Sequence, residues 1–439
     1  MENKNSNQIE AFALEPVSAE NRKSWISVTF VQAGMFICVP SLLLGAMLAQ
    51  SMSFWHAAIA GILGYLLTLV LTFVLGMQGA DLGIPTCAIC QSTFGRKGVR
   101  LIVSSLFGIS LMGWFGLQTS VCGEAFTNII REGFGFTIPV SVSSVIWGLI
   151  MLATAVFGMN ALNKLDSLSV PLMVFIMVLG TVLALRSYGT AGLGTEVEES
   201  MSIMQGIGLS FSFSAVGAIT AADITRFQRN RKDTIKSSFW GIMPAGLFTL
   251  VLGILMTKIT GVYDISMVLV AVGIPFLGII ILVLATWTTN SLNAYCGGLN
   301  VIMTFNLPDN RRREATFAAG IVGILLSVLG ILGHIEQFLS LLSYVFSAIG
   351  GVMIADYWFV GKGKKENWHP QEGYNWTGII ATILGVAGAA LIGIEYSGIL
   401  FALVIFLIIE RFVPSQSRNK NTQAVNEEKT GGTINENII

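Results

Sequence analysis

Charged side chains are scarce in this sequence. Only 11% of its 439 residues are Asp, Glu, Lys or Arg, whereas soluble domains carry roughly 25%. Hydrophobic residues make up 53% of the chain, and they are gathered in long runs with few ionisable groups. This composition excludes a water-soluble domain and predicts that the surrounding solvent is a lipid bilayer.

Histidine and cysteine are also scarce, and they form no catalytic or metal-binding pattern. The 3 histidines lie near predicted loops and converge with no acid or nucleophile. Of the 5 cysteines, Cys87 and Cys90 are the only motif-like pair, and no second pair or neighbouring histidine completes a zinc site. The sequence also lacks a nucleotide-binding loop. We therefore expect neither an enzyme nor nucleotide-driven transport, so any energy would come from an ion gradient.

Twelve apolar stretches divide the chain. A helix needs about 20 apolar residues to cross about 30 Å of hydrocarbon. Backbone polar groups in lipid must be paired within the segment, so helices are expected. The sequence predicts an all-α integral membrane protein with twelve transmembrane helices, at residues 26–50, 54–77, 101–126, 137–159, 167–185, 202–222, 238–258, 267–300, 315–333, 336–360, 374–393 and 396–412.

Basic residues are distributed unevenly among the segments between these stretches. If the N-terminus is cytoplasmic, 22 of the 25 Lys and Arg residues fall on the cytoplasmic side, and only Arg131, Arg186 and Lys258 fall outside. The positive-inside rule then predicts cytoplasmic termini in a bacterial inner membrane. Residues 1–25 are expected to be a cytoplasmic segment, because they lack the apolar region of a signal peptide. The polar residues 413–439 predict a disordered cytoplasmic tail.

Glycine and proline interrupt two of the stretches at corresponding places. Gly34 and Pro40 lie near the middle of the first stretch, and Gly217 lies among small and hydroxylated residues in the sixth. Breaks five stretches apart are typical of two inverted repeats whose broken helices meet at a binding site. The pattern predicts one five-helix repeat over 26–185, a second over 202–360, and two further helices over 374–412. Close packing of membrane helices is the alternative explanation for these glycines.

The eighth stretch carries a polar string, "LATWTTNSLNAY", at residues 284–295. At about 3.6 residues per turn, one helical face carries Ala285, Thr288, Thr289 and Asn293, with Asn290 on its flank. Oxygen ligands suit a hard cation, and unwound carbonyl groups around Gly34 to Ile37 would add to them. The spacing favours a cation site, and hydrogen bonding between helices is the alternative.

The third stretch presents an aromatic side chain beside an amide. Trp114 and Gln118 are four residues apart and share a helical face. An indole stacks on flat rings, and a glutamine amide both donates to and accepts from the edge of a heterocycle. Phe211 and Phe213, in the sixth stretch, are candidates for an opposing aromatic surface. These residues predict a site for a planar polar ring.

Four strings resemble the signatures of a known family: "GWFGLQT" (113–119), "AADITRF" (221–227), "WTTNSLNAY" (287–295) and "GGVMIADYW" (350–358). On these motifs the chain resembles the nucleobase-cation-symport-1 family from about residue 24 to residue 412. The resemblance implies the leucine-transporter type fold, with two inverted repeats of five helices followed by two more helices. It also implies import of nucleobases, hydantoins and related compounds together with Na⁺ or H⁺.

Carried over by motif, the resemblance implies a site for Na⁺ as the coupling ion. Its ligands would be the carbonyl groups of Gly34, Ile37 and Ala285 and the hydroxyl groups of Thr288 and Thr289.

The resemblance implies a substrate site beside it. Trp114 would stack on one face of the base, and Gln118 and Asn290 would reach its polar edge. Asn293 would assist. The substrate segment of the sixth stretch corresponds to Ser212, Phe213 and Ser214.

The match to the family departs from its pattern at two places. The chain has one residue more between Phe213 and Asp223 than the pattern, so the stacking ring is either Phe213 or Phe211. Gln91 stands where the family has an arginine, which leaves the substrate open. Asp223 and Arg226 are expected to hold the inner end of the sixth helix and not to contact substrate.

The function expected from the sequence is secondary active import of a nucleobase, cytosine first, by Na⁺ symport through alternating access. The alternative is an H⁺-coupled importer of another base or a related heterocycle: a purine, uracil, hydantoin, allantoin or hydroxymethylpyrimidine. Glu124 is the candidate proton site for that alternative. The expected partners are a small-molecule substrate and the bilayer, with no nucleic acid, and the chain is expected to be a monomer.

Overall fold

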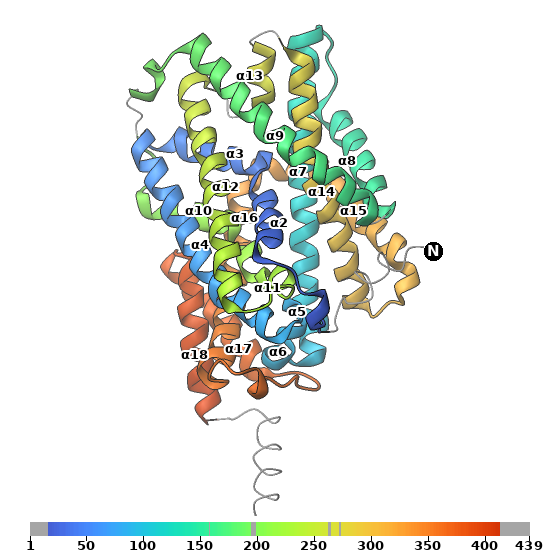
Figure 1. Cartoon of the computed structure of the whole chain (residues 1–439), viewed down its shortest axis with the longest axis vertical. Helices are drawn as coiled ribbons and strands as arrows, with labels where there is room; N and C mark the ends of the chain where they lie inside the picture. The colour runs from blue at the N-terminus through green and yellow to red at the C-terminus, as the bar shows by residue number, and fades with distance from the viewer. Residues whose placement is uncertain (1–15, 158, 195–198, 262–264, 272–273, 413–439) are drawn as a thin grey trace, which may run out of the picture.

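The computed structural model describes residues 16–157, 159–194, 199–261, 265–271 and 274–412, without the side chains of residues 159–170, 265, 285, 288 and 309. The predicted tail at 413–439 and residues 1–15 lie outside this part of the chain. Its regular structure is helical (Figure 1). The α-helices are α2 (Trp25–Phe36), α3 (Val39–Ser51), α4 (Phe54–Leu82), α5 (Thr86–Ile89), α6 (Gln91–Gly98), α7 (Ser104–Phe134), α8 (Val140–Phe157), α9 (Met159–Tyr188), α10 (Ile203–Ile219), α11 (Ala221–Thr225), α12 (Arg231–Thr260), α13 (Ile265–Ala271), α14 (Pro275–Phe305), α15 (Arg312–Val328), α16 (Ile335–Ile354), α17 (Trp376–Ile392) and α18 (Gly398–Phe412).

Most of these helices are long and apolar. Within the described residues, 7 helices are long and apolar enough to cross a membrane, and the bent pair of α2 and α3 makes an eighth. Each predicted stretch overlaps a helix, although 267–300 is shared between α13 and α14. The helices α10, α15, α17 and α18 have only 17, 17, 17 and 15 residues. The all-helical membrane architecture is confirmed, and the number of twelve spans stays a prediction.

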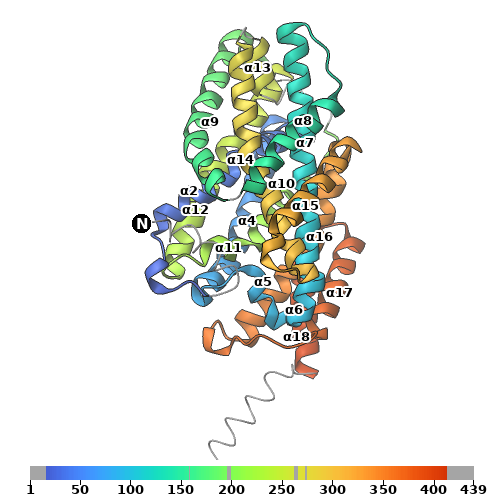
Figure 2. The same cartoon turned by 90° about the vertical axis from the view of Figure 1, so that its right-hand side faces the viewer.

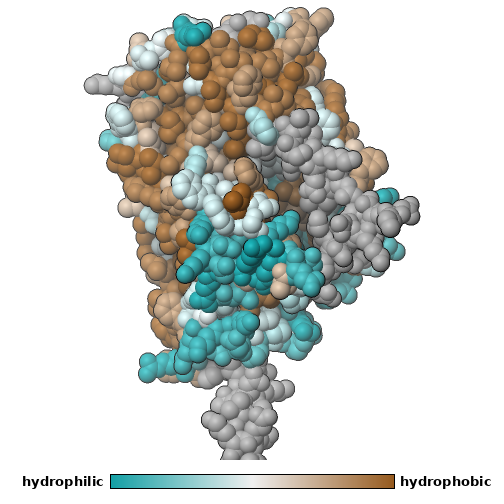
Figure 3. All heavy atoms as spheres, in the orientation of Figure 1, coloured by the Kyte–Doolittle hydropathy of each residue, from teal (hydrophilic) through white to brown (hydrophobic). Residues whose placement is uncertain are grey.

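The outer surface of the molecule is suited to lipid. Large apolar side chains such as Phe30, Trp55 and Leu391 are 72%, 73% and 89% exposed. Figure 3 shows hydrophobic residues covering most of one face, with hydrophilic residues gathered below them. Apolar surface of this extent is stable in a bilayer and would promote aggregation in water.

The first stretch is broken, as predicted. The helices α2 and α3 meet at a bend of 54°, and Ile37 (φ −85°, ψ 75°) and Cys38 (φ −148°, ψ 162°) between them are not helical. Pro40 lies in the first turn of α3, where its missing N–H costs no helical hydrogen bond. The break therefore follows Gly34 by three residues and precedes the proline that starts the second half.

The sixth stretch is also interrupted, but not at Gly217. The helix α10 continues through Gly217 to Ile219, and Thr220 (φ −84°, ψ 12°) separates it from α11. A Cβ atom built on Gly217 would meet nothing within 4 Å, so this glycine serves neither as the break nor for close packing. The predicted position was three residues too early. The interruption lies at Thr220, and a threonine is not a sequence signal for the end of a helix.

The long helices pack in two groups. One group consists of α2, α3, α4, α10, α11 and α12, and the other of α7, α8, α14 and α15. In the first group, α2 contacts α11 and α3 contacts α10, so the two broken stretches lie side by side (Figures 1 and 2). The helices α16, α17 and α18 pack on one another, and α16 also contacts α10. The predicted repeats, 26–185 and 202–360, each contribute helices to both groups.

Glycine lets the first group pack with backbones in contact. A Cβ atom on Gly253 of α12 would lie 2.3 Å from the carbonyl oxygen of Leu42 on α3, and one on Gly45 would lie 2.5 Å from that of Leu250. Only glycine fits at such approaches. The broken helix is thereby held against a long continuous helix.

Candidate substrate and cation site

Two glycines in the string "GWFGLQT" determine how α7 is packed. A Cβ atom on Gly113 would lie 2.3 Å from the ring of Phe338 on α16, and one on Gly116 would lie 2.6 Å from the carbonyl oxygen of Gly323 on α15. The absent side chains let α15 and α16 approach α7 closely. Trp114, between these glycines, is consequently placed where several helices meet.

An aromatic corner surrounds Trp114. Its ring centroid is 5.5 Å from that of Phe213 on α10, with the planes at 88°. The ring of Phe338 on α16 also faces Trp114, with the ring centroids 6.0 Å apart and the planes at 75°. Edge-to-face contacts of this kind are favourable for aromatic pairs. Phe338 was not predicted, since its context, "IEQFLS", is that of an ordinary amphipathic helix.

The structure separates the two phenylalanines of α10. Phe211 is fully buried and lies against Tyr396, with centroids 6.0 Å apart. Phe213 is partly exposed and lies against Trp114. The residue that the structure brings to the aromatic corner is therefore Phe213, and Phe211 belongs to the apolar core.

The serines on either side of Phe213 have different surroundings. The Ser214 hydroxyl lies 2.6 Å from that of Thr68 on α4, and it also donates to the carbonyl of Ser210. Ser214 thus joins α10 to α4 and does not point to Trp114. The Ser212 hydroxyl is buried and has no hydrogen-bond partner among the described residues.

Gln118 lies one turn beyond Trp114 and is almost fully buried. Its side-chain oxygen has no hydrogen-bond donor within the described part of the chain. A buried polar atom without a partner costs about 1–3 kcal/mol. An amide that is kept in this state beside an aromatic corner is available to a ligand with an N–H group.

The polar string on α14 has two faces with different contacts. On one face, Trp287 donates to the hydroxyl of Thr154 (2.9 Å) and Ser291 donates to the carbonyl of Met151 (3.1 Å), both on α8. On the other face, Thr289 and Asn293 make no hydrogen bond to another described residue and are partly exposed. The first face holds the helix in place, and the second is free for a ligand.

Asn290 lies between these two faces. Its amide nitrogen donates to the carbonyl of Phe115 (3.1 Å) and to the hydroxyl of Thr119 (3.0 Å), both on α7. Its amide oxygen is buried without a partner among the described residues. The nitrogen therefore joins two helices, and only the oxygen is left for the predicted substrate contact.

The break in the first stretch offers carbonyl groups to a cation. The carbonyl of Ala33 accepts from the N–H of Ile37 (3.1 Å), and that of Phe36 accepts from Thr249 (3.1 Å). The carbonyls of Gly34 and Ile37, the two predicted ligands, accept no hydrogen bond within the described residues.

The helix α14 reaches this break through apolar contacts. Ile281 belongs to the same buried cluster as Ile37, and Leu284 packs against that cluster. The side chains of Ala285 and Thr288 lie outside the described part of the structure. Unpaired carbonyl oxygens beside the start of a threonine-bearing turn fit a hard cation such as Na⁺.

Two acidic residues named from the sequence lie away from this site. Asp223 accepts a hydrogen bond from the N–H of Thr86 (2.7 Å), so it holds α11 to α5 as expected. Glu124, the candidate proton site, is exposed on α7 and is not part of the buried core.

Fold and site together define a class of protein. A helical membrane chain with two broken spans side by side, and with unpaired backbone carbonyls at the first break, has the features typical of the leucine-transporter type fold. A solved structure has the same fold: Mhp1, a nucleobase-cation-symport-1 family transporter, in a closed conformation with bromovinylhydantoin bound, superimposes with a TM-score of 0.78 over 93% of this chain and 98% of that one, at 20% identity.

Sequence comparison gives the family. The family described as "Permease for cytosine/purines, uracil, thiamine, allantoin" matches residues 16–408, and the chain belongs to it, within the nucleobase-cation-symport-1 transporters. Cytosine permease of Escherichia coli (strain K12) is 28% identical over 86% of this chain and 88% of its own length. Hydantoin permease of Microbacterium maritypicum is 24% identical over 78% and 74%. These relatives are permeases, which confirms that the chain is a multi-pass transporter and not an enzyme.

Proposed function

We propose that the chain imports a nucleobase, cytosine first, by symport with Na⁺. The observation that carries this proposal is the position of Gln118, whose buried amide oxygen lacks a partner one turn from the aromatic corner of Trp114 and Phe213. A flat ring with an N–H edge satisfies both features at once. The relative with the printed name cytosine permease supports cytosine as the first substrate to test.

The residues divide the recognition of the base among them. Trp114 and Phe213 provide aromatic surface for the ring. The oxygens of Gln118 and Asn290 would accept hydrogen bonds from ring or exocyclic N–H groups, and the Ser212 hydroxyl and Asn293 are further candidates. A base that lacks these donors would leave the amide oxygens unpaired, which gives selectivity.

The cation would be held by Gly34 and Ile37 from the break and by Thr289 from α14, with Ala285 and Thr288 as the remaining expected ligands. A cation at this place would join the first helix group to the second. Binding of base and cation to the same joined state makes each tighten the other by the same factor. Such reciprocal tightening is what symport requires.

Alternating access would follow from relative movement of the two helix groups. The group containing α2, α3, α10 and α12 and the group containing α7 and α14 meet at the proposed site. Rocking of one group against the other exposes a fixed midplane site to each side in turn. We further propose that both termini are cytoplasmic, because 22 of the 25 Lys and Arg residues then fall on the cytoplasmic side of the predicted topology. The chain is also proposed to be a monomer.

Uptake by the purified chain in liposomes tests the function. Radiolabelled cytosine should accumulate against its gradient when Na⁺ is higher outside, and a sodium ionophore should abolish accumulation. Accumulation that persists without Na⁺ and stops with a protonophore would instead establish the H⁺-coupled alternative. Competition by uracil, adenine, hypoxanthine, hydantoin and allantoin then ranks the substrates, and absence of accumulation for all of them would refute nucleobase import.

A further inference from the structure

A pocket of about 750 Å³ lies at the surface of the described structure, and six basic residues line it. It lies between the segment before α2, the end of α4, the start of α12 and the loop that follows residue 360. The pocket shares no residue with the proposed transport site.

The pocket, called here the basic pocket, has a strong excess of positive charge. Its two acids are Asp81 and Glu366, and its six cations are Arg22, Arg229, Arg231, Lys232, Lys364 and Lys365. Arg231 is paired with Asp81. The other cations form no ion pair with a described residue. Concentrated unpaired charge of one sign in a concavity attracts a counter-ion.

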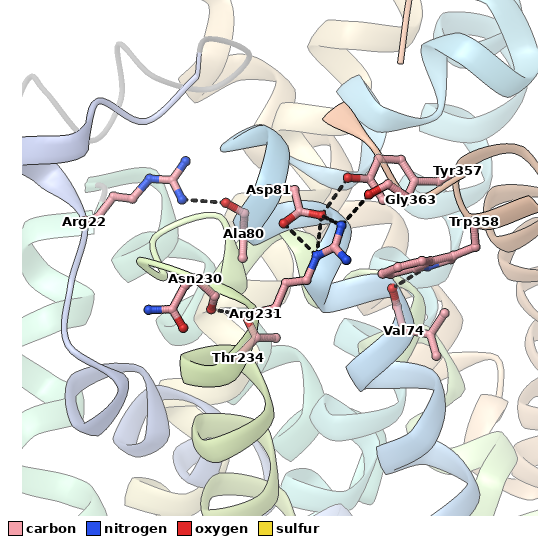
Figure 4. Close-up of polar contacts among 10 residues, drawn as sticks. All are labelled: Arg22, Val74, Ala80, Asp81, Asn230, Arg231, Thr234, Tyr357, Trp358 and Gly363. Carbon is pink, nitrogen blue, oxygen red and sulfur yellow. Dashed lines mark hydrogen bonds and ion pairs between the residues drawn. The ribbon is translucent and has the colours of Figure 1, made fainter. Parts of the chain in front are cut away.

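Two arginines of the basic pocket are held in fixed positions. Arg22 donates to the carbonyls of Ala80 and Gln228, and Arg231 donates to Asp81 and to the carbonyl of Gly363. Figure 4 shows the two guanidinium groups approaching the end of α4 from opposite sides. Burial lowers the pKa of the Arg22 guanidinium, and the nearby Asp81 carboxylate opposes that shift. Fixed arginines need little ordering to receive an anion.

The start of α12 adds partial positive charge to the same place. Asn230 caps the helix by accepting from the N–H of Asp233 (2.9 Å), which leaves the N–H groups of Arg231 and Lys232 without an acceptor among the described residues. Free N–H groups in the first turn bind phosphate oxygens well. This feature strengthens a site that the unpaired cations already define.

The basic pocket borders the lipid-facing surface. On α12, Ile235, Phe239 and Trp240 are 40%, 42% and 55% exposed, and on α2 Ile26 and Phe30 are 51% and 72% exposed. These apolar side chains begin within one or two turns of the basic residues. An anion with a hydrocarbon tail would therefore meet cations and apolar surface together.

We propose that the basic pocket binds a phosphate group, carried by an anionic lipid headgroup or by a soluble phosphate compound. Arg22, Lys232 and Lys364 come from three separate segments, so an anion among them would join these segments. The bound phosphate would stabilise their present arrangement, and release would free the segment that leads into the broken helix.

Native mass spectrometry of the purified full chain in neutral detergent tests the proposal. Phosphatidylglycerol should bind about tenfold or more tightly than phosphatidylcholine, because the choline cation of phosphatidylcholine offsets its phosphate charge whereas phosphatidylglycerol keeps a net negative charge. The double variant Lys364→Ala, Lys365→Ala should lose about 25-fold in affinity for phosphatidylglycerol, because each cation contributes roughly fivefold. Neither lysine side chain makes an ion pair in the described structure, so the variant should fold.

A matched control removes the same charge outside the basic pocket. Arg311→Ala with Arg313→Ala takes two exposed cations from the start of α15 and the turn before it and should change binding less than about twofold. Displacement of the lipid by inorganic phosphate, at constant ionic strength, would identify the phosphate group alone as sufficient. Retention of the lipid would identify the lipid headgroup as the source. Equal losses in the two double variants, or equal binding of the two lipids, would overturn the proposal.

Discussion

The indole of Trp114 meets the ring of Phe213 edge to face, with centroids 5.5 Å apart and planes at 88°, across the contact between α7 and α10. This pair links the two helix groups at the level of the proposed substrate. A substrate ring that leaves the proposed site must lose its contact with Trp114 or with Phe213. Substitutions of these two residues should therefore change substrate binding.

Replacing Trp114 by Leu should weaken base binding strongly. Loss of a base-stacking ring costs about 1–3 kcal/mol, or about 5- to 150-fold in Kd. Equilibrium binding of radiolabelled cytosine measures the change. Trp287→Leu is the matched control, because that indole donates to Thr154 between α14 and α8 and should leave Kd unchanged. Equal effects of the two variants would show that Trp114 acts only through packing.

Replacing Gln118 by Met should separate binding from stability. The side-chain oxygen of Gln118 has no partner in the described structure, so Met should leave the melting temperature unchanged or raised. Base affinity should fall by about 2- to 12-fold, the worth of one neutral hydrogen bond. Gln32→Met should lower the melting temperature and leave the base affinity unchanged, since Gln32 donates to Ser238 (3.1 Å) within the first helix group. Unchanged cytosine affinity in Gln118→Met would remove this residue from the site.

Replacing Thr289 by Ala should weaken the cation and the base together. Loss of one oxygen ligand should raise the Na⁺ concentration for half-maximal uptake by about tenfold or more. Thr286→Ala is a close control, because its hydroxyl is already bonded to the carbonyl of Leu282 (2.7 Å). Uptake measured against Na⁺ concentration distinguishes them, and wild-type Na⁺ dependence in Thr289→Ala would refute the cation site.

Two glycines of the first helix group should respond in opposite ways to Ala. Gly253→Ala would place a Cβ atom 2.3 Å from the carbonyl oxygen of Leu42, and overpacking of this kind costs about 1–3 kcal/mol. Gly217→Ala meets nothing within 4 Å inside a regular helix and should stabilise by about 0.5–1 kcal/mol. Melting temperatures in one detergent compare the two. A stable Gly253→Ala variant would show that α3 and α12 can separate without cost.

The sequence predicted those features of the fold that depend on local composition. Hydropathy located the helices, and Gly34 with Pro40 indicated a broken first stretch, which the structure places at Ile37 and Cys38. The break predicted at Gly217 was wrong, because a glycine in a membrane helix can mark a break, a close packing contact or neither. Thr220, where α10 ends, carried no signal at all.

The arrangement of the site could be predicted only in part. Helical spacing placed Trp114 and Gln118 one turn apart on α7, and the structure adds Phe213 beside Trp114 and an unpaired oxygen on Gln118. Spacing could not choose between Phe211 and Phe213, because that choice depends on how α10 is rotated against α7. Nor could spacing show that the amide nitrogen of Asn290 donates to the carbonyl of Phe115 and to the hydroxyl of Thr119. Such contacts join helices far apart in sequence and follow from packing.

Asp81 connects three segments on the face of the basic pocket, and its removal should loosen them. Its carboxylate accepts from Arg231 (2.6 Å) at the start of α12 and from the hydroxyl of Tyr357 (2.6 Å) after α16. Asp81→Asn would weaken both contacts, and hydrogen bonds to charged groups contribute about 1.5–3 kcal/mol. Because Arg231 is partly exposed, hydrogen bonds to water should replace part of the lost interaction. The free energy of unfolding is therefore expected to fall by about 1–2 kcal/mol.

The measurement for Asp81→Asn is the melting temperature in one detergent, with Asp233→Asn as the control. Asp233 also lies at the start of α12 but forms no ion pair in the described structure. Arg231→Lys separates charge from geometry, since lysine keeps the charge but cannot present two nitrogens to Asp81 and a third contact to Gly363. If only the charge matters, Arg231→Lys will melt like the wild type. If the paired guanidinium contacts to Asp81 and Gly363 join the segments, the melting temperature of Arg231→Lys will be nearly as low as that of Asp81→Asn.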